Sequence, residues 1–260
     1  MKYAISRGRI LTWSLETHLV DHCNLRCGDC CTLSPSLASW HADPDDLAKD
    51  LAFASRALRP NLFKLTGGEP LLHPELLRCL EMVRDSGISE AVSLTTNGLL
   101  LAAQPDALFE ALDRITLSRY SSAPLPESSV RAIAERCQRF GVRLTVKEID
   151  RFQVLDAPAP RSPTETRGTF DACWLKQRCH LLYRGSFYTC TRPPHLAQRD
   201  HGEETAAHAD GVELEGPRLR ERLAGYQERA EPLAACSTCL GAGGSWRDHR
   251  QMPRASIAAP

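Results

Sequence analysis

The sequence CNLRCGDC, residues 23–30, decides how the rest of the chain is organised. It places Cys23, Cys27 and Cys30 at a C-x3-C-x2-C spacing within one short segment. Thiolates are the usual protein ligands of iron–sulfur clusters, and three of them can hold three irons of a four-iron cubane while the fourth iron stays open. An iron with an open position can bind a substrate or a cofactor, so this segment predicts a reactive cluster.

Two other kinds of site can be built from cysteines. A zinc site usually joins one C-x2-C pair to a second pair or to histidines, and Cys236 and Cys239 could complete one with Cys27 and Cys30. A disulfide framework is also open to a chain with 11 cysteines. Neither site explains a third cysteine at the x3 spacing together with the sequence GGEP at residues 67–70.

The three-cysteine spacing followed by GGEP resembles the radical SAM superfamily. The resemblance implies that the cluster binds S-adenosyl-L-methionine (SAM) through its amino and carboxylate groups. One electron then cleaves SAM to methionine and a 5′-deoxyadenosyl radical, which abstracts a hydrogen atom from the substrate. The cofactor-binding residues that the resemblance implies are Gly67, Gly68, Glu69, Pro70, Asn97, Ser118 and Arg119.

One position departs from the family pattern. Many members have an aromatic residue directly before the third cysteine, near the adenine, whereas this chain has Asp29. Cys31 follows the third cysteine and is left as a free thiol.

Composition excludes several classes of protein. The 260 residues contain 32 Lys+Arg and 32 Asp+Glu, so no overall field favours nucleic acid or an anionic membrane. The first residues lack the apolar segment of a signal peptide, and no stretch is long enough to span a bilayer. Clustered cysteines in such a chain indicate metal or redox chemistry in a reducing compartment, so we expect a cytoplasmic protein.

Strand and helix patterns alternate over the first part of the chain. This alternation predicts an α/β fold with a parallel sheet and outer helices, and with the resemblance it predicts a partial TIM-type (β/α)5-6 barrel. Active-site residues of such barrels follow the strands. The cysteine segment, the glycine pair, Asn97 and Ser118 follow the first four strands, so we expect them on one rim. The expected strands are residues 12–20, 62–66, 90–96, 114–119 and 142–149.

Three prolines in residues 156–163 indicate a linker, which divides the chain into a barrel domain, 1–155, and a second domain, 156–260. The spacing from Cys173 through Gly185 to Cys190 is similar to the Twitch/SPASM auxiliary-cluster domains. The resemblance implies a second 4Fe–4S cluster, with Cys179 competing for the place of Cys173. A zinc site made by the same thiolates remains open. The four implied ligands are Cys173, Cys190, Cys236 and Cys239.

A fully ligated second cluster suits removal of a second electron from the substrate radical. The domain plan is similar to the radical SAM dehydrogenases of butirosin-type aminocyclitol biosynthesis, which implies an oxidoreductase acting on a small sugar-like or aminocyclitol-like molecule. It also implies an electron donor such as flavodoxin or ferredoxin.

Three alternatives stay open. One is a radical epimerase that uses Cys179 as hydrogen-atom donor, another is a peptide-modifying radical SAM enzyme, and the last is a zinc-binding interaction protein. Residues 246–249 follow a glycine-rich turn and could fold back as a lid.

Overall fold

The computed structural model describes residues 3–202 and 210–253. The end of the predicted second domain, residues 254–260, lies outside the described residues. The strands are β1 (Ile5–Ser6), β2 (Arg9–Thr12), β3 (Leu15–Val20), β4 (Leu58–Pro60), β5 (Phe63–Gly67), β6 (Val92–Thr96), β7 (Arg114–Tyr120), β8 (Arg143–Ile149), β9 (Arg151–Gln153), β10 (Leu181–Tyr183), β11 (Ser186–Tyr188), β12 (Val212–Glu213) and β13 (Trp246–Asp248).

Seven α-helices lie within the described residues, and short 3-10 turns connect several of the elements. Among these turns are η2 (Pro70–Leu72), η4 (Trp174–Gln177) and η6 (Ala234–Thr238). The α-helices are α1 (Pro44–Ala57), α2 (Leu76–Asp85), α3 (Asp106–Glu110), α4 (Glu127–Arg139), α5 (Pro163–Ala172), α6 (Arg192–His201) and α7 (Leu219–Gln227).

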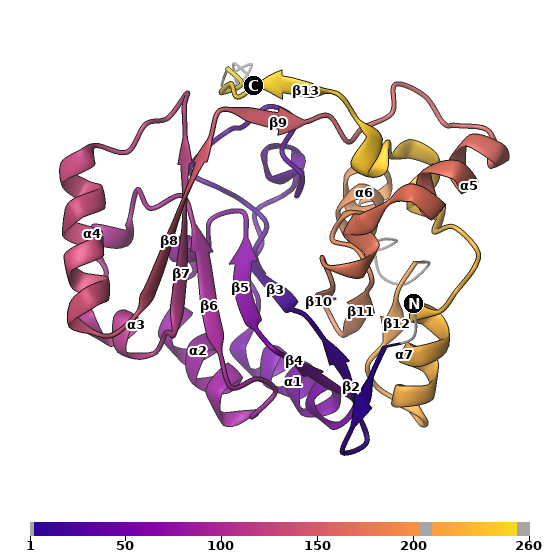
Figure 1. Ribbon diagram of the computed structural model, residues 1–260, viewed down its shortest axis with the longest axis horizontal. Coiled ribbons are helices and arrows are strands. Elements are labelled where there is room, and N and C mark those ends of the chain that lie inside the picture. Colours follow the sequence, from indigo (N-terminus) through magenta and orange to yellow (C-terminus); the bar gives the residue numbers. More distant parts are fainter. Residues whose placement is uncertain (1–2, 203–209, 254–260) are drawn as a thin grey trace, which may run out of the picture.

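The central sheet has the order β12-β11-β10-β3-β5-β6-β7-β8. Strands β3, β5, β6, β7 and β8 are parallel to their neighbours, as the alternating pattern predicts. Helices α1 to α4 follow the outer side of the curved sheet, and α5 to α7 gather at its β10–β12 end (Figure 1). The chain therefore has the predicted α/β fold with a partial TIM-like barrel.

The barrel helices form because their apolar residues recur at helical spacing and face the sheet. In α1, the Asp43 side chain accepts hydrogen bonds from two backbone N–H groups of the first turn, while Leu47 and Leu51 are buried. These leucines join one continuous core with Phe63 and Leu65 of β5. The core thus fixes the strands whose carboxyl ends carry the predicted site.

The expected first strand, residues 12–20, is wrong in its extent. Two strands occupy this region, because β2 pairs with β4 in a separate three-stranded sheet while β3 pairs with β5 in the central sheet. All six residues of β3 are buried, since β3 has a partner strand on each edge.

The predicted second domain continues the barrel sheet. Strand β10 runs parallel to β3, with Leu181 opposite Glu16, and the hairpin turns at Arg184 and Gly185, both at positive φ. Strand β13 pairs with β9, so the end of the described chain returns to the barrel. Within the described residues, no helix is long and apolar enough to cross a membrane.

Candidate functional site

The four predicted rim segments meet at one pocket of about 240 Å³, which we call the rim pocket. It lies where the carboxyl ends of β3, β5, β6 and β7 come together, as a parallel sheet requires. The predicted residues that line it are Cys23, Cys27, Cys30, Gly67, Gly68, Glu69, Asn97 and Ser118.

The glycine pair lets the end of β5 run directly against the segment that leads into the cysteines. The N–H of Gly68 donates to the Val20 carbonyl (2.8 Å) and the N–H of Glu69 to the His22 carbonyl (3.1 Å). A Cβ atom would lie 2.3 Å from the Val20 oxygen at Gly67, which has φ +135°, and 1.9 Å from the His22 oxygen at Gly68. Only glycine fits at either position, so the pair sets the place of Cys23 relative to the sheet.

The Glu69 carboxylate joins the loops that follow β5 and β6. It accepts hydrogen bonds from the Thr96 hydroxyl (2.7 Å) and from the backbone N–H groups of Asn97 (2.8 Å) and Leu71 (3.1 Å). Burial raises the pKa of Glu69, and these three donors oppose the rise. Glu69 is only 1% exposed, and its hydrogen bonds fix the backbone at Leu71 and Asn97 beside the pocket.

Asn97 connects the third rim segment to the cysteine segment. Its amide nitrogen donates to the Asn24 side-chain oxygen at 2.6 Å and lies 3.8 Å from the Cys23 sulfur. Its own oxygen accepts the N–H of Leu99, which fixes the orientation of the amide.

Two predicted cofactor-binding residues lie outside the lining of the rim pocket. Pro70 begins the η2 turn behind Glu69. Arg119 follows Ser118 on β7, and its guanidinium contacts Glu127 (2.5 Å) and Glu148 (2.7 Å). Neighbouring side chains of a strand face opposite sides, so Ser118 and Tyr120 line the pocket while Arg119 does not.

Residues 246–252, here called the C-terminal strap, cover the cysteine segment. Backbone hydrogen bonds join Gly28 and Arg26 to the strap (N···O 2.9 and 2.7 Å). The Gln251 side chain accepts the Arg26 N–H at 2.7 Å and donates its amide to the Cys27 sulfur at 3.4 Å. The sequence gives no sign of this contact, because 224 residues separate Gln251 from Cys27.

The strap also explains the aspartate that stands where an aromatic residue was expected. Asp29 has φ 60°, and its carboxylate lies 3.6 Å from Arg247 and 3.8 Å from Arg250 of the strap. The residue thus anchors the C-terminal strap electrostatically.

Aromatic side chains line the rim pocket from another direction. Tyr120 stacks on His249 of the strap with ring centroids 4.7 Å apart, and Phe152 meets His249 edge-on at 4.8 Å. Tyr120 and Phe152 both line the pocket. An aromatic wall is therefore present, although it comes from β7 and β9 rather than from the cysteine segment.

A second, small pocket is lined by all four thiols of the implied auxiliary set: Cys173, Cys190, Cys236 and Cys239. We call it the auxiliary pocket. Cys179 does not line it. Burial, followed by the nearby Glu16 carboxylate, raises the pKa of Cys179 to about 12, and Cys173 is among the groups that add to this rise.

The spacing of the sulfur atoms bears on the kind of metal that they could hold. Tetrahedral zinc at ~2.3 Å from each sulfur brings thiolates to within ~3.8 Å of one another. Among the described residues, the one set of three such ligand atoms within 4.8 Å of one another is His18, Asp21 and His195, which contains no cysteine. In the part of the chain that the structure describes, the thiols of neither cysteine set are gathered this closely, and both sets consist of the thiolates that iron–sulfur clusters use.

Arg192 connects the two pockets. It lines the auxiliary pocket, and its guanidinium donates to the backbone carbonyl of Cys31 at 3.3 Å. Cys31 lines the rim pocket. Arg192 is 3% exposed and forms an ion pair with Asp156, so a single buried side chain lies between the two sites.

Known proteins resemble the chain in sequence and in fold. It is 37% identical over 117 residues to a GTP 3',8-cyclase of Microcystis aeruginosa and 38% identical over 117 residues to one of Streptomyces coelicolor. These matches cover 42% and 43% of this chain, and 35% and 33% of those proteins. The chain thus spans about a third of the length of the curated relatives that it matches. No protein-family model matches it.

Among solved structures, BtrN in complex with AdoMet and 2-DOIA has a TM-score of 0.52 with this chain at 13% identity. The match covers 90% of this chain and 95% of that one. The two proteins share a fold over almost their whole lengths.

Proposed function

We propose that the chain is a radical SAM oxidoreductase that uses SAM and two 4Fe–4S clusters to dehydrogenate a small hydroxylated molecule; its likeness to BtrN in fold and to GTP 3',8-cyclases over about two-fifths of its sequence supports the proposal. The observation that supports the oxidative outcome most directly is the auxiliary pocket, where four thiols can ligate a cluster fully. A fully ligated cluster can accept an electron and has no open iron for substrate.

In this proposal Cys23, Cys27 and Cys30 hold the first cluster, and Gly67 and Gly68 present backbone to the methionine part of SAM. When bound, these groups would supply the 5′-deoxyadenosyl radical that abstracts a hydrogen atom. The residues of the chain position the reactants and exclude water.

Tyr120 and Phe152 would pack against the adenine of SAM, because their rings form the aromatic wall of the rim pocket. They take the place of the aromatic residue that Asp29 replaces. The Gln251 amide and the strap close the pocket on the side of Cys27.

The charges around the rim pocket favour a substrate without phosphate groups. Of the residues that line it, Glu69 is the charged one, and three donors already occupy its carboxylate. Of the cations near the pocket, Lys64 pairs with Glu16 at 2.7 Å and Arg192 with Asp156, and Arg26 of the cysteine segment is a single guanidinium without an ion pair among the described residues. A triphosphate would need unpaired cations or backbone donors here, whereas a polyol would not.

Radical epimerisation is the second candidate, and the position of Cys179 supports it. This thiol does not line the auxiliary pocket, although it lies near Cys190 and Cys173, and the Glu16–Lys64 pair is also close to it, so it is available as a hydrogen-atom donor. A Cys179→Ala variant that still forms 5′-deoxyadenosine but loses product would favour the epimerase. Unchanged product formation would favour the dehydrogenase.

The test is anaerobic reconstitution followed by turnover with a panel of aminocyclitols, sugars and GTP. We expect about eight irons per chain, and one 5′-deoxyadenosine released for each oxidised product. A flavodoxin or ferredoxin would supply the electron for SAM cleavage. About four irons per chain would contradict the second cluster, and turnover of GTP alone would contradict the substrate class.

A further inference from the structure

Three buried side chains converge at a place that belongs to neither thiol pocket. His18 lies on β3, Asp21 directly follows that strand, and His195 lies on α6. The distances are 2.7 Å from His18 Nδ1 to His195 Nε2 and 4.0 Å from His195 Nε2 to the near Asp21 oxygen, Oδ1. None of the three side chains is more than 1% exposed. Their ligand atoms all lie within 4.8 Å of one another.

The Asp21 carboxylate is satisfied on one oxygen only. Its Oδ2 atom accepts from the Tyr183 hydroxyl at 2.7 Å, from Arg184 at 3.3 Å and from the Gln198 amide at 3.4 Å. Its Oδ1 atom, which faces the imidazoles, is buried without a hydrogen-bond partner. Buried polar atoms are rarely left unpaired, so this oxygen is a free ligand atom aimed at the two imidazoles.

The two imidazoles share a hydrogen bond of 2.7 Å between His18 Nδ1 and His195 Nε2, so one of these two facing nitrogens carries a lone pair. Donors behind a ligating carboxylate are a support that metal ligands usually have, and here the Tyr183 hydroxyl and the Gln198 amide donate to Oδ2 of Asp21.

We propose that His18, Asp21 and His195 form a site for one divalent transition-metal ion, with Zn²⁺ as the best match to two imidazole nitrogens and one carboxylate oxygen. Ligand bonds of ~2.0–2.2 Å in a tetrahedral site place donor atoms ~3.3–3.6 Å apart, so the 4.0 Å separation between His195 Nε2 and Asp21 Oδ1 closes by about half an ångström when the ion binds. The two imidazoles, which share one hydrogen bond at 2.7 Å, separate slightly when the ion enters between them.

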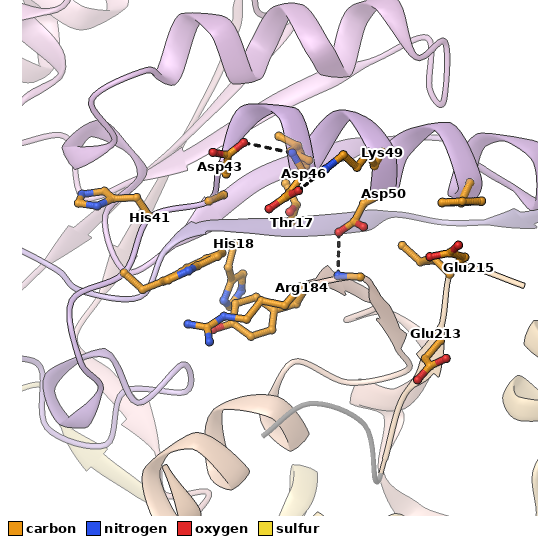
Figure 2. Close-up of a pocket in the computed structure, with 17 residues that line it drawn as sticks. Thr17, His18, His41, Asp43, Asp46, Lys49, Asp50, Arg184, Glu213 and Glu215 are labelled. Carbon is orange, nitrogen blue, oxygen red and sulfur yellow. Dashed lines mark hydrogen bonds and ion pairs between the residues drawn. The ribbon is translucent and has the colours of Figure 1, made fainter. Parts of the chain in front are cut away.

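A route for the ion leads through a cavity of about 690 Å³ between α1 and the β10–β11 hairpin. His18 lines this cavity, and Figure 2 shows it beside Arg184, across from the acidic side chains of α1. Asp43, Asp46 and Asp50 line the same cavity. The cavity is also lined by Lys49 and Arg184, but its carboxylates outnumber these cations, so it attracts divalent cations toward His18, the one proposed ligand that lines it.

The position of the site indicates what the ion would do. His18 lies five residues before Cys23, and His195 lies five residues after Cys190. An ion bound by both would join β3 to α6 and so fix the rim pocket relative to the auxiliary pocket. This role does not depend on the reaction proposed above, because it concerns only the two elements that carry the thiols.

The full chain is first reconstituted with iron and sulfide and is then incubated with ZnCl2. Free metal is removed by dialysis, and the bound zinc is measured by mass spectrometry. We expect about one zinc per chain in the native protein and roughly tenfold or weaker affinity in His195→Gln. Tyr183→Phe, which removes one support of Asp21, should weaken zinc binding by about tenfold. Co²⁺ bound here should lack the sulfur-to-cobalt absorption of a thiolate site.

His180→Gln is the matched control, because His180 is also fully buried but lies outside the three ligands. It should keep the zinc. Circular dichroism of each variant separates loss of the ion from loss of the fold. The proposal is overturned if the native chain holds no zinc, if His195→Gln binds it as tightly, or if the bound Co²⁺ shows thiolate absorption.

Discussion

Replacement of Gln251 by leucine should make the first cluster harder to reduce. The Gln251 amide donates to the Cys27 sulfur at 3.4 Å, and this hydrogen bond lowers the pKa of a thiol that burial raises to about 11. The N–H group therefore stabilises negative charge on the sulfur. Reduction adds one negative charge to a cluster held by Cys27, so the bond is stronger in the reduced state.

The size of the shift follows from the strength of one hydrogen bond. Bonds to charged groups contribute ~1.5–3 kcal/mol, and we assign ~1 kcal/mol of this to the difference between the two redox states. A tenfold change in a one-electron equilibrium is ~1.4 kcal/mol or ~59 mV, so the midpoint potential should fall by ~40 mV. Gln251→Glu should lower it further, because a carboxylate would lie beside the thiolate.

The assay is a redox titration of the reconstituted protein followed by electron paramagnetic resonance, which reports each cluster without turnover. Ser122→Ala is a suitable control, because the same amide contacts the Ser122 hydroxyl at 3.4 Å and this contact should not affect the potential. An unchanged or higher potential in Gln251→Leu would show that the strap covers the cysteine segment without influencing its electronics.

Three further changes have expected outcomes. Cys173→Ala should halve the iron content of the reconstituted protein, whereas Cys179→Ala should leave it unchanged, because only Cys173 lines the auxiliary pocket; the reverse result would exchange their roles. Gly68→Ala should lower the free energy of unfolding in urea by at least ~2–3 kcal/mol, since its Cβ would lie 1.9 Å from a backbone carbonyl, whereas Gly168→Ala, with open space around it, should not destabilise. Burial raises the pKa of Asp50 to about 6, so the folded state binds the Asp50 proton more tightly than the unfolded state does. The free energy of unfolding should therefore fall by ~2–3 kcal/mol as pH rises from 4 to 6, and Asp50→Asn should flatten this dependence.

The rim of the barrel could be predicted from the sequence because its determinants are local. Alternation of strand and helix implies parallel strands, and the carboxyl ends of parallel strands meet at one edge. Cys23, Gly68, Asn97 and Ser118 therefore came together as expected, although they lie far apart in the chain. The hairpin of β10 and β11 is local in the same sense, since its two-residue turn at Arg184 and Gly185 determines its own backbone.

The contacts that could not be predicted depend on pairing between distant segments. Gln251 meets Cys27 because β13 pairs with β9, and three residues are too few to produce a recognisable strand pattern. The break between β2, which ends at Thr12, and β3, which begins at Leu15, depends on which sheet each strand joins. Alternation along β7 puts Arg119 on the face opposite to Ser118 and Tyr120. The sequence did not show which of these two faces lines the pocket.

Strand β3 connects these observations, since it has β5 on one edge and β10 on the other. Its position is thus determined both by the barrel strand β5 and by β10, which belongs to the segment that carries the auxiliary thiols. Glu16 and His18 lie two residues apart and share one face, where Glu16 pairs with Lys64 and His18 with His195. A shift of β3 would move the cysteine segment and break both pairs, so the relative position of the two pockets is set by this strand rather than by the proline-rich linker.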